Sequence, residues 1–166
     1  MQPKNGEAVL ITGAAGSVGR TAVYVAKQHG AHVIAGVLAK QKAEAESLGA
    51  DSIVAIDDDT QIATLPELDA IADTVDGETI GKLIPWLRKS GRLASVLGKP
   101  PAAEKAGIDV KPVWSRPDGK RLCELAKDVG DGKFRIPIAQ RFPLREIRAA
   151  HRAAQNGVEG KIALIP

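Results

Sequence analysis

The chain has 166 residues, which suits one domain with a substantial core. Hydrophobic residues make up 44% and charged residues 26% of the sequence, a globular composition that excludes a disordered tail. The formal net charge is +3, basic and acidic residues are interspersed and 3% of the residues are aromatic, so a nucleic-acid partner is not expected.

The N-terminal sequence and the cysteine content indicate the compartment. No apolar stretch approaches the roughly 20 residues that span a bilayer, and MQPKNGEAVL lacks the order of a signal peptide. Cys123 is the single cysteine and cannot form an internal disulfide, which agrees with a reducing compartment. We therefore expect a cytoplasmic protein with no membrane partner.

Short apolar runs alternate with longer helical patterns along most of the chain, as is typical of βαβ units and a parallel sheet. The predicted strands are 7–12, 31–37, 52–56, 68–75, 91–98 and 108–114. The predicted helices are 17–29, a stretch ending at 48, a stretch ending near 89, and 118–129. These elements predict an α/β fold of the Rossmann type, a doubly wound parallel sheet in the order 3-2-1-4-5-6 with helices on both faces.

The last part of the chain departs from this alternation. An extended piece at 134–138, a helix at 144–155 and a final strand at 161–166 are predicted there. We therefore divide the chain into a dinucleotide-binding domain, residues 1–133, and a C-terminal helix and strand, residues 134–166. In a sheet of this order a ligand binds where the carboxyl ends of the first and fourth strands meet.

A glycine-rich turn, TGAAGSVG, stands between the first predicted strand and the first predicted helix. Gly13 permits the tight turn, Gly16 lets the backbone approach a pyrophosphate, and Gly19 lets helix and strand pack closely. Backbone amides of residues 15–18 would then face phosphates at the positive end of the helix. A structural strand-to-helix turn is the alternative, but the apolar strand before the turn and the amphipathic helix after it favour a dinucleotide.

The end of the second predicted strand bears on the choice of cofactor. An acidic residue normally accepts the ribose 2′-hydroxyl of NAD about 20 residues after the glycines. Here Gly36 and Leu38 are followed by Lys40 and Lys42, whose charges could neutralise a 2′-phosphate. NADP(H) is therefore preferred over NAD(H), with ordinary exposed helix positions as the alternative for both lysines.

Four segments carry a resemblance to a known family. They are DTVDGET at 73–79, SGRLASVLG at 90–98, RPDGKRLCELAKDVGDGKFR at 116–135 and FPLREIRAAHRAAQNGVEGKIALIP at 142–166. In this order they resemble the medium-chain dehydrogenase/reductase superfamily, especially its zinc-free quinone-oxidoreductase-like members, and correspond to their C-terminal nucleotide-binding domain. A short-chain reductase, the alternative family, needs a Tyr-x-x-x-Lys pair, whereas the single tyrosine, Tyr24, is followed four residues later by Gln28.

The resemblance implies a set of cofactor-binding residues. Those at the pyrophosphate would be Gly13, Ala15, Gly16, Ser17 and Val18, and Lys40 and Lys42 would lie near the 2′-phosphate. Those at the ribose and nicotinamide would be Asp73, Thr74, Val75, Leu97, Gly98 and Lys99. Strand-end hydrogen bonding is the alternative role for Asp73 and Thr74.

The resemblance also implies a reaction. Family members carry a GroES-like catalytic domain, to which residues 134–166 would return, with the strand at 161–166 left unpaired without it. The chain would bind NADPH and, in a full-length oxidoreductase, present it for hydride transfer to a quinone, enone or similar carbonyl, and it would be inactive alone. We predict no catalytic residue in this chain and no zinc, because three histidines and one cysteine assemble no zinc set.

A partner and an alternative function complete the expectations. Family members dimerise through an edge strand, which the predicted strand at 108–114 would supply, so a homodimer is expected. A stand-alone NADP(H)-binding or sensing module that acts through another protein is the second hypothesis.

Overall fold

The computed structural model describes residues 2–75, 78–158 and 160–166, and the chain divides into two compact units, Met1–Asp118 and Gly119–Pro166. The first unit contains a six-stranded sheet in the order β3-β2-β1-β4-β5-β6, in which every pairing is parallel. Its strands are β1 Ala8–Thr12, β2 His32–Val37, β3 Ser52–Ala55, β4 Leu68–Asp73, β5 Leu87–Ser95 and β6 Val110–Pro112. The predicted fold class and strand order are confirmed.

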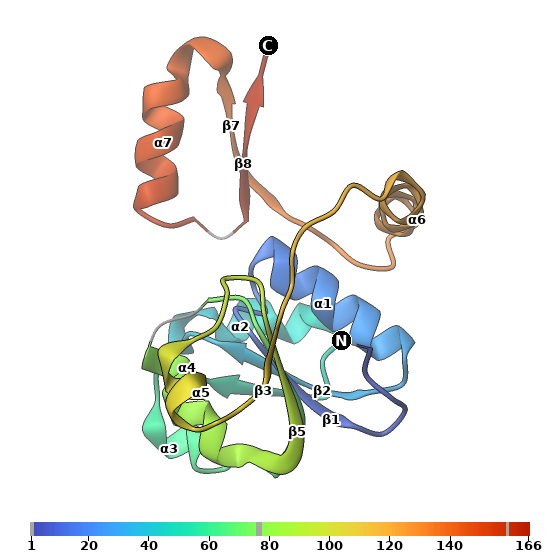
Figure 1. Cartoon of the computed structure of the whole chain (residues 1–166). Helices are drawn as coiled ribbons and strands as arrows, with labels where there is room; N and C mark the ends of the chain where they lie inside the picture. The colour runs from blue at the N-terminus through green and yellow to red at the C-terminus, as the bar shows by residue number, and fades with distance from the viewer. Residues whose placement is uncertain (1, 76–77, 159) are drawn as a thin grey trace. The chain divides into compact units, whose positions relative to one another are not determined.

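Helices cover both faces of this sheet (Figure 1). They are α1 Ser17–Gln28, α2 Lys42–Ala45, α3 Asp59–Ile62, α4 Glu78–Leu83 and α5 Pro101–Lys105, with short 3-10 turns at η1 Ala39–Gln41, η2 Glu46–Leu48 and η3 Ile84–Trp86. The alternation of side chains along β1 explains the two layers. Val9 and Ile11 pack with α1 and α2, whereas Leu10 packs in the cluster that contains residues of α3, α4 and α5.

The boundaries of β4, β5 and β6 differ from the predicted ones. The helix predicted to end near residue 89 is broken earlier, because Pro85 cannot continue the helical hydrogen bonds, and β5 begins at Leu87. β4 ends at Asp73 and β5 at Ser95, before the residues that leave the sheet toward the site. β6 is confined to Val110–Pro112 and pairs with β5, which leaves its other side as a sheet edge.

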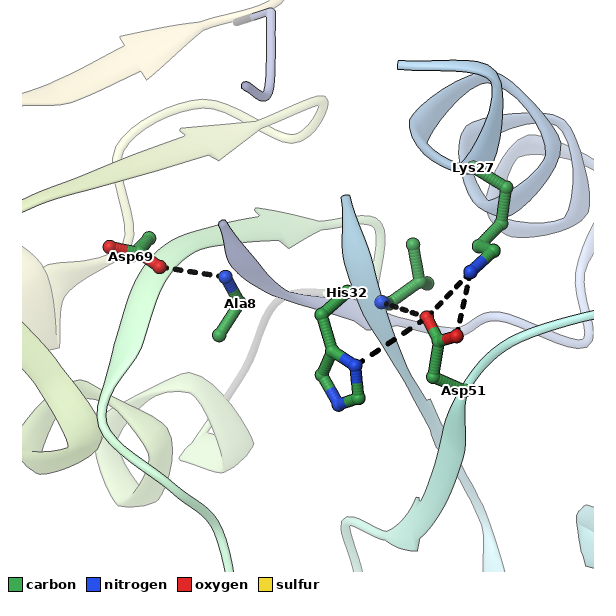
Figure 2. A network of polar contacts seen from close by, with 6 residues as sticks. Ala8, Lys27, His32, Asp51 and Asp69 are labelled. Carbon is green, nitrogen blue, oxygen red and sulfur yellow. Dashed lines mark hydrogen bonds and ion pairs between the residues drawn. The ribbon is translucent and has the colours of Figure 1, made fainter. Parts of the chain in front are cut away.

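Carboxylates hold the amino ends of the strands together (Figure 2). Asp51 accepts hydrogen bonds from Lys27 Nζ at 2.7 and 2.8 Å and from the Val33 amide at 2.7 Å. The bonds from Lys27 are the main reason that the pKa of Asp51 lies below its usual value. Asp69 accepts from the Ala8 amide at 2.7 Å. This end of the sheet is therefore occupied by structural contacts, and the carboxyl end is left for a ligand.

The second unit contains α6 Gly119–Gly130, β7 Ile138–Pro143, η4 Leu144–Glu146, α7 Ile147–Gln155 and β8 Lys161–Ile165. β7 and β8 pair in parallel, and α7 packs against both. The extended piece was predicted at 134–138, which is wrong, because β7 begins at residue 138 and ends at residue 143. The final predicted strand, β8, is paired with β7 along one side. The predicted functional boundary at residue 133 stays a prediction. No helix among the described residues is long and apolar enough to cross a bilayer.

Candidate functional site

The site lies where β1 and β4 are neighbours and their connections leave in opposite directions. β1 pairs with β2 on one side and β4 on the other, so the chain turns toward α1 after Thr12 and away from it after Asp73. Such a switch point opens a crevice at the carboxyl ends of the strands. The glycine-rich turn, residues 13–16, stands at this point and leads directly into α1.

Two glycines of the turn are required by close packing. Gly13 has φ +62°, and a Cβ there would lie 2.5 Å from both Thr74 Oγ1 and Val75 Cγ1. A Cβ on Gly19 would lie 2.1 Å from the Gly13 carbonyl oxygen and 2.6 Å from Ala14 Cα, both of them backbone atoms. The turn and α1 therefore approach each other as closely as the sequence predicts.

Gly16 has a different role. It is the exposed N-cap of α1, its backbone is extended (φ −75°, ψ 165°), and no side chain caps the helix there. A Cβ on Gly16 would meet one neighbour, the Gly13 carbonyl oxygen at 3.2 Å. A side chain at this position thus requires the Gly13 carbonyl to move by a few tenths of an ångström, a smaller displacement than at Gly13 or Gly19, and the space in front of Gly16 is what a ligand would need.

The backbone amides of the turn are partly committed. The Gly16 amide donates to the Gly13 carbonyl at 2.9 Å, and the Ala14 amide donates to the Gly36 carbonyl at 3.1 Å. Because the first amides of a helix have no acceptor within it, those of Ser17 and Val18 at the start of α1 are the donors that suit a diphosphate. Ala15 is buried, so within the predicted set it shapes the turn.

Asp73 forms a buried polar network with the strands on either side. Its carboxylate accepts from Thr12 Oγ1 of β1 at 2.9 Å and from Ser95 Oγ of β5 at 2.9 Å. The Val75 amide donates to the same carboxylate at 3.3 Å. Asp73 is 1% exposed, so its side chain ties the three strand ends together beneath the crevice and performs the strand-end role that was the alternative to a cofactor contact.

The network continues into the two loops that border the crevice. The Thr74 amide donates to Thr12 Oγ1 at 3.0 Å, and the Thr74 hydroxyl donates to the Thr12 carbonyl at 2.7 Å. The Leu97 amide donates to Ser95 Oγ at 3.1 Å. Thr12 and Ser95 were missed by the sequence reasoning, although a lone hydroxyl residue at the last position of an apolar strand was a signal that could have found them.

Several apolar side chains near the carboxyl ends of the strands are exposed. They follow the carboxyl ends of β1, β2, β4 and β5, and are Val18, Leu38, Val75, Val96 and Leu97, each between 38% and 56% exposed. Exposed apolar groups gathered at one end of a sheet, beside a few polar donors, are typical of a pocket for an organic ring. Gly98 and Lys99, also predicted site residues, continue the loop after β5, with Gly98 at φ +104° and Lys99 Nζ 3.8 Å from Glu104 Oε1.

The two predicted lysines differ in their surroundings. Lys42 Nζ donates to Gln61 Oε1 at 3.0 Å and is half-buried, whereas Lys40 is exposed on η1. An acid also lies nearby, because Asp57 at the end of β3 accepts from the Ala39 amide at 2.8 Å. Gly36 is a packing position, since a Cβ there would lie 3.0 Å from Ile56 Cγ2. Sequence reasoning missed Asp57 because it lies in the turn after the next strand, β3.

Two further results concern the composition of the site. Within the described parts of the chain, no group of three or more His, Cys, Asp or Glu side chains is arranged to hold a metal ion. Residues 76 and 77 of the DTVDGET segment and residue 159 of the closing segment lie outside the described residues.

Comparisons with known proteins agree with this geometry. The family described as zinc-binding dehydrogenase matches residues 48–164. The chain is 31% identical over 170 residues to acryloyl-coenzyme A reductase of Metallosphaera sedula, covering 97% of this chain and 51% of that protein. It is 29% identical over 180 residues to the mitochondrial NAD(P)H oxidoreductase RTN4IP1 of Danio rerio, covering 90% of this chain and 46% of that protein.

A solved structure shows the same similarity in three dimensions. The quinone oxidoreductase of Coxiella burnetii superimposes with a TM-score of 0.83 at 28% identity, covering 97% of this chain and 53% of that one. The chain thus spans about half the length of these relatives. The family match sets aside the short-chain reductase alternative. The chain belongs to the zinc-binding dehydrogenase family, within the medium-chain dehydrogenase/reductase superfamily predicted from its sequence.

Proposed function

We propose that this chain is the NADPH-binding domain of an oxidoreductase. The observation that carries the proposal is the strand-turn-helix junction, in which Gly13 and Gly19 pack against backbone and side chains while Gly16 stays exposed in front of α1. The diphosphate would lie against the amides of Ser17 and Val18, where the helix dipole favours negative charge.

The preference for NADP(H) rests on charge at the end of β2. Lys40 is the exposed cation of this segment and would face the 2′-phosphate, whereas Lys42 is held by Gln61. Asp57 bonds to the Ala39 amide beside it and would oppose a phosphate there. Lys40 therefore has to outweigh Asp57, which makes this single side chain decisive for the preference.

The reaction is inferred from the relatives, whose names include an NAD(P)H oxidoreductase, an acryloyl-coenzyme A reductase and a quinone oxidoreductase. We propose hydride transfer from NADPH to a quinone, an enone or a similar carbonyl compound, without zinc. The bound nicotinamide supplies the hydride, and this domain supplies binding and orientation. Val75 and Leu97 border the crevice with exposed apolar side chains that would keep water from a ring lying on them.

Assembly is part of the same proposal. We propose that the chain works together with a catalytic domain like that of its longer relatives, and that it forms a homodimer through β6. The free side of Val110–Pro112 is the sheet edge available for such pairing, although Pro112 removes one of its donors.

Calorimetric titration with NADPH and with NADH tests the proposal. We expect saturable binding of one cofactor per chain, tighter for NADPH, and no reduction of a quinone by the chain alone. Tighter binding of NADH would reject the lysine argument, and binding of neither cofactor would reject the proposed function. Turnover by the isolated chain would contradict the need for a second domain.

A further inference from the structure

Arg20 is a buried cation next to the glycine-rich turn. It follows Gly19 directly in α1, and it is 6% exposed. Its Nε donates to the Ala15 carbonyl at 2.8 Å, and its Nη2 forms an ion pair with Glu44 of α2, whose side chain is 16% exposed. The cofactor-binding residues predicted from the sequence do not include it.

The two contacts of Arg20 use the particular geometry of a guanidinium group. One edge of the planar fork reaches a backbone carbonyl while the other reaches a carboxylate, which an ammonium group on a flexible stem reproduces poorly. Burial of a charge pair is costly and is seldom favoured for stability alone, since apolar side chains of similar size serve a helix face as well or better. This points to a role for Arg20 in fixing the position of the groups that it contacts.

The contacts connect two segments of the proposed site. Ala15 belongs to the turn in front of the diphosphate, and Glu44 belongs to α2, which follows directly after η1 and Lys40. With its carbonyl held by Arg20 and the next amide, that of Gly16, bonded to Gly13, the peptide group between Ala15 and Gly16 has a fixed orientation. The amides of Ser17 and Val18 come directly after this fixed group.

We propose that Arg20 is a positioning residue for the cofactor, which fixes the Ala15 peptide so that the amides at the start of α1 face the diphosphate, and which ties this turn to α2 through Glu44. The inference rests on the proposed function. It names a residue that touches no ligand and acts through the backbone of the turn.

Arg20→Lys is the informative variant because it keeps the positive charge opposite Glu44 while removing the guanidinium Nε that donates to the Ala15 carbonyl. Arg20→Met removes both contacts. Arg92→Met is the matched control, because Arg92 also pairs with a carboxylate, that of Glu7, and is part-buried, but it lies in β5 toward the amino end of the sheet.

The affinity of each variant of the 166-residue chain is measured by calorimetry with NADPH and with adenosine 2′-monophosphate, which lacks the diphosphate, and the melting temperature of each variant is also measured. We expect Arg20→Lys to bind NADPH at least about fivefold more weakly, because the charge-assisted hydrogen bond that fixes the Ala15 carbonyl is lost. The same variant should bind adenosine 2′-monophosphate as the wild type does. Arg92→Met should melt earlier and bind both ligands as the wild type does.

Three results would overturn the inference. If Arg20→Lys and a folded Arg20→Met bind NADPH with wild-type affinity, Arg20 has no positioning role, although the proposed function stands. If Arg20→Lys loses both ligands equally, the residue is merely structural. If the wild type binds neither NADPH nor NADH, the proposed function fails and this role fails with it.

Discussion

Gly16 and Gly19 lie three residues apart, but a side chain added at one has a different expected outcome from a side chain added at the other. In Gly19→Ala the new methyl group would lie 2.1 Å from a backbone oxygen and 2.6 Å from a backbone carbon, so neither neighbour can rotate away. Overpacking of this kind destabilises the folded state by about 1–3 kcal/mol, and the better helix propensity of alanine offsets about 1 kcal/mol of this. Because both close contacts are with backbone atoms, the upper end of this cost applies, and we expect a net loss of about 2 kcal/mol in the free energy of unfolding, which lowers the melting temperature by roughly 4–8 °C.

Gly16→Ser should affect stability much less. Its Cβ meets a single atom at 3.2 Å, the backbone is already extended, and serine is a favourable N-cap where the helix has no side-chain cap. The melting temperature should change little, because the added cap offsets the small shift required of the Gly13 carbonyl. The added side chain nevertheless occupies the space in front of α1, so the affinity for NADPH should fall at least about tenfold, equivalent to about 1.4 kcal/mol.

The pair is measured by thermal unfolding and by calorimetric titration with NADPH, with Gly119→Ala as control because a Cβ there has nothing within 4 Å. A Gly16→Ser protein that melts near the wild-type temperature and still binds NADPH with wild-type affinity would refute the placement of the diphosphate at this turn. A Gly19→Ala protein as stable as the wild type would refute the packing argument, because it would mean that α1 can move away from the turn at no cost.

Three further outcomes follow from the contacts of the first unit. Lys40→Ala should reduce the preference for NADPH over NADH about tenfold or more, whereas Lys42→Ala should change it much less, as competitive titration would show; an equal loss in both would refute the assignment. Asp73→Asn should lower the free energy of unfolding by about 1–3 kcal/mol in urea, because it places an amide donor opposite hydroxyl donors; an unchanged midpoint would contradict the network. Asp51 has a pKa held below its ordinary value, so the stability it adds is present above the unfolded pKa of about 4 and is lost as pH falls through the folded pKa. Asp51→Asn should therefore flatten the dependence of melting temperature on pH in that acid range relative to wild type, and Lys27→Met should flatten it partly; identical profiles would show that the pair contributes nothing.

Most elements of the first unit could be predicted from the sequence, because its strands are apolar and several of its turns contain glycine. The six strands and their order were predicted correctly, and the errors fall where a local signal was misjudged. The predicted helix included Pro85 and ended near residue 89. Pro85 instead lies in the 3-10 turn that ends the helical segment, and β5 begins at Leu87, four residues earlier than predicted. β7 was missed because its residues IAQRFP alternate weakly and are held as a strand by pairing with β8, a non-local cause.

The candidate site was predictable where it depends on backbone and less so where it depends on side chains. Gly13, Gly16 and Gly19 are adjacent in sequence, and their spacing already specifies the turn. Asp57 and Arg20 act on residues of other elements, Ala39 and Glu44, and no spacing in a single sequence indicates those contacts. Sequence reasoning also treated Lys40 and Lys42 alike, although Gln61 holds one of them.

The buried network around Asp73 bears on the division between binding and chemistry. Asp73 is the last residue of β4, which pairs with β1 on one side and β5 on the other, yet its oxygens receive hydrogen bonds from Thr12, Ser95 and Val75, and it is 1% exposed. A group buried in this way does not reach a substrate, and it keeps the strand ends in place while ligands come and go. The groups that the proposal places against the diphosphate and the ring, the amides of Ser17 and Val18 and the side chains of Val75 and Leu97, bind and orient but transfer no proton. In the proposed function the hydride therefore comes from the cofactor and any proton from other residues, which is why we expect the isolated chain to bind without turnover.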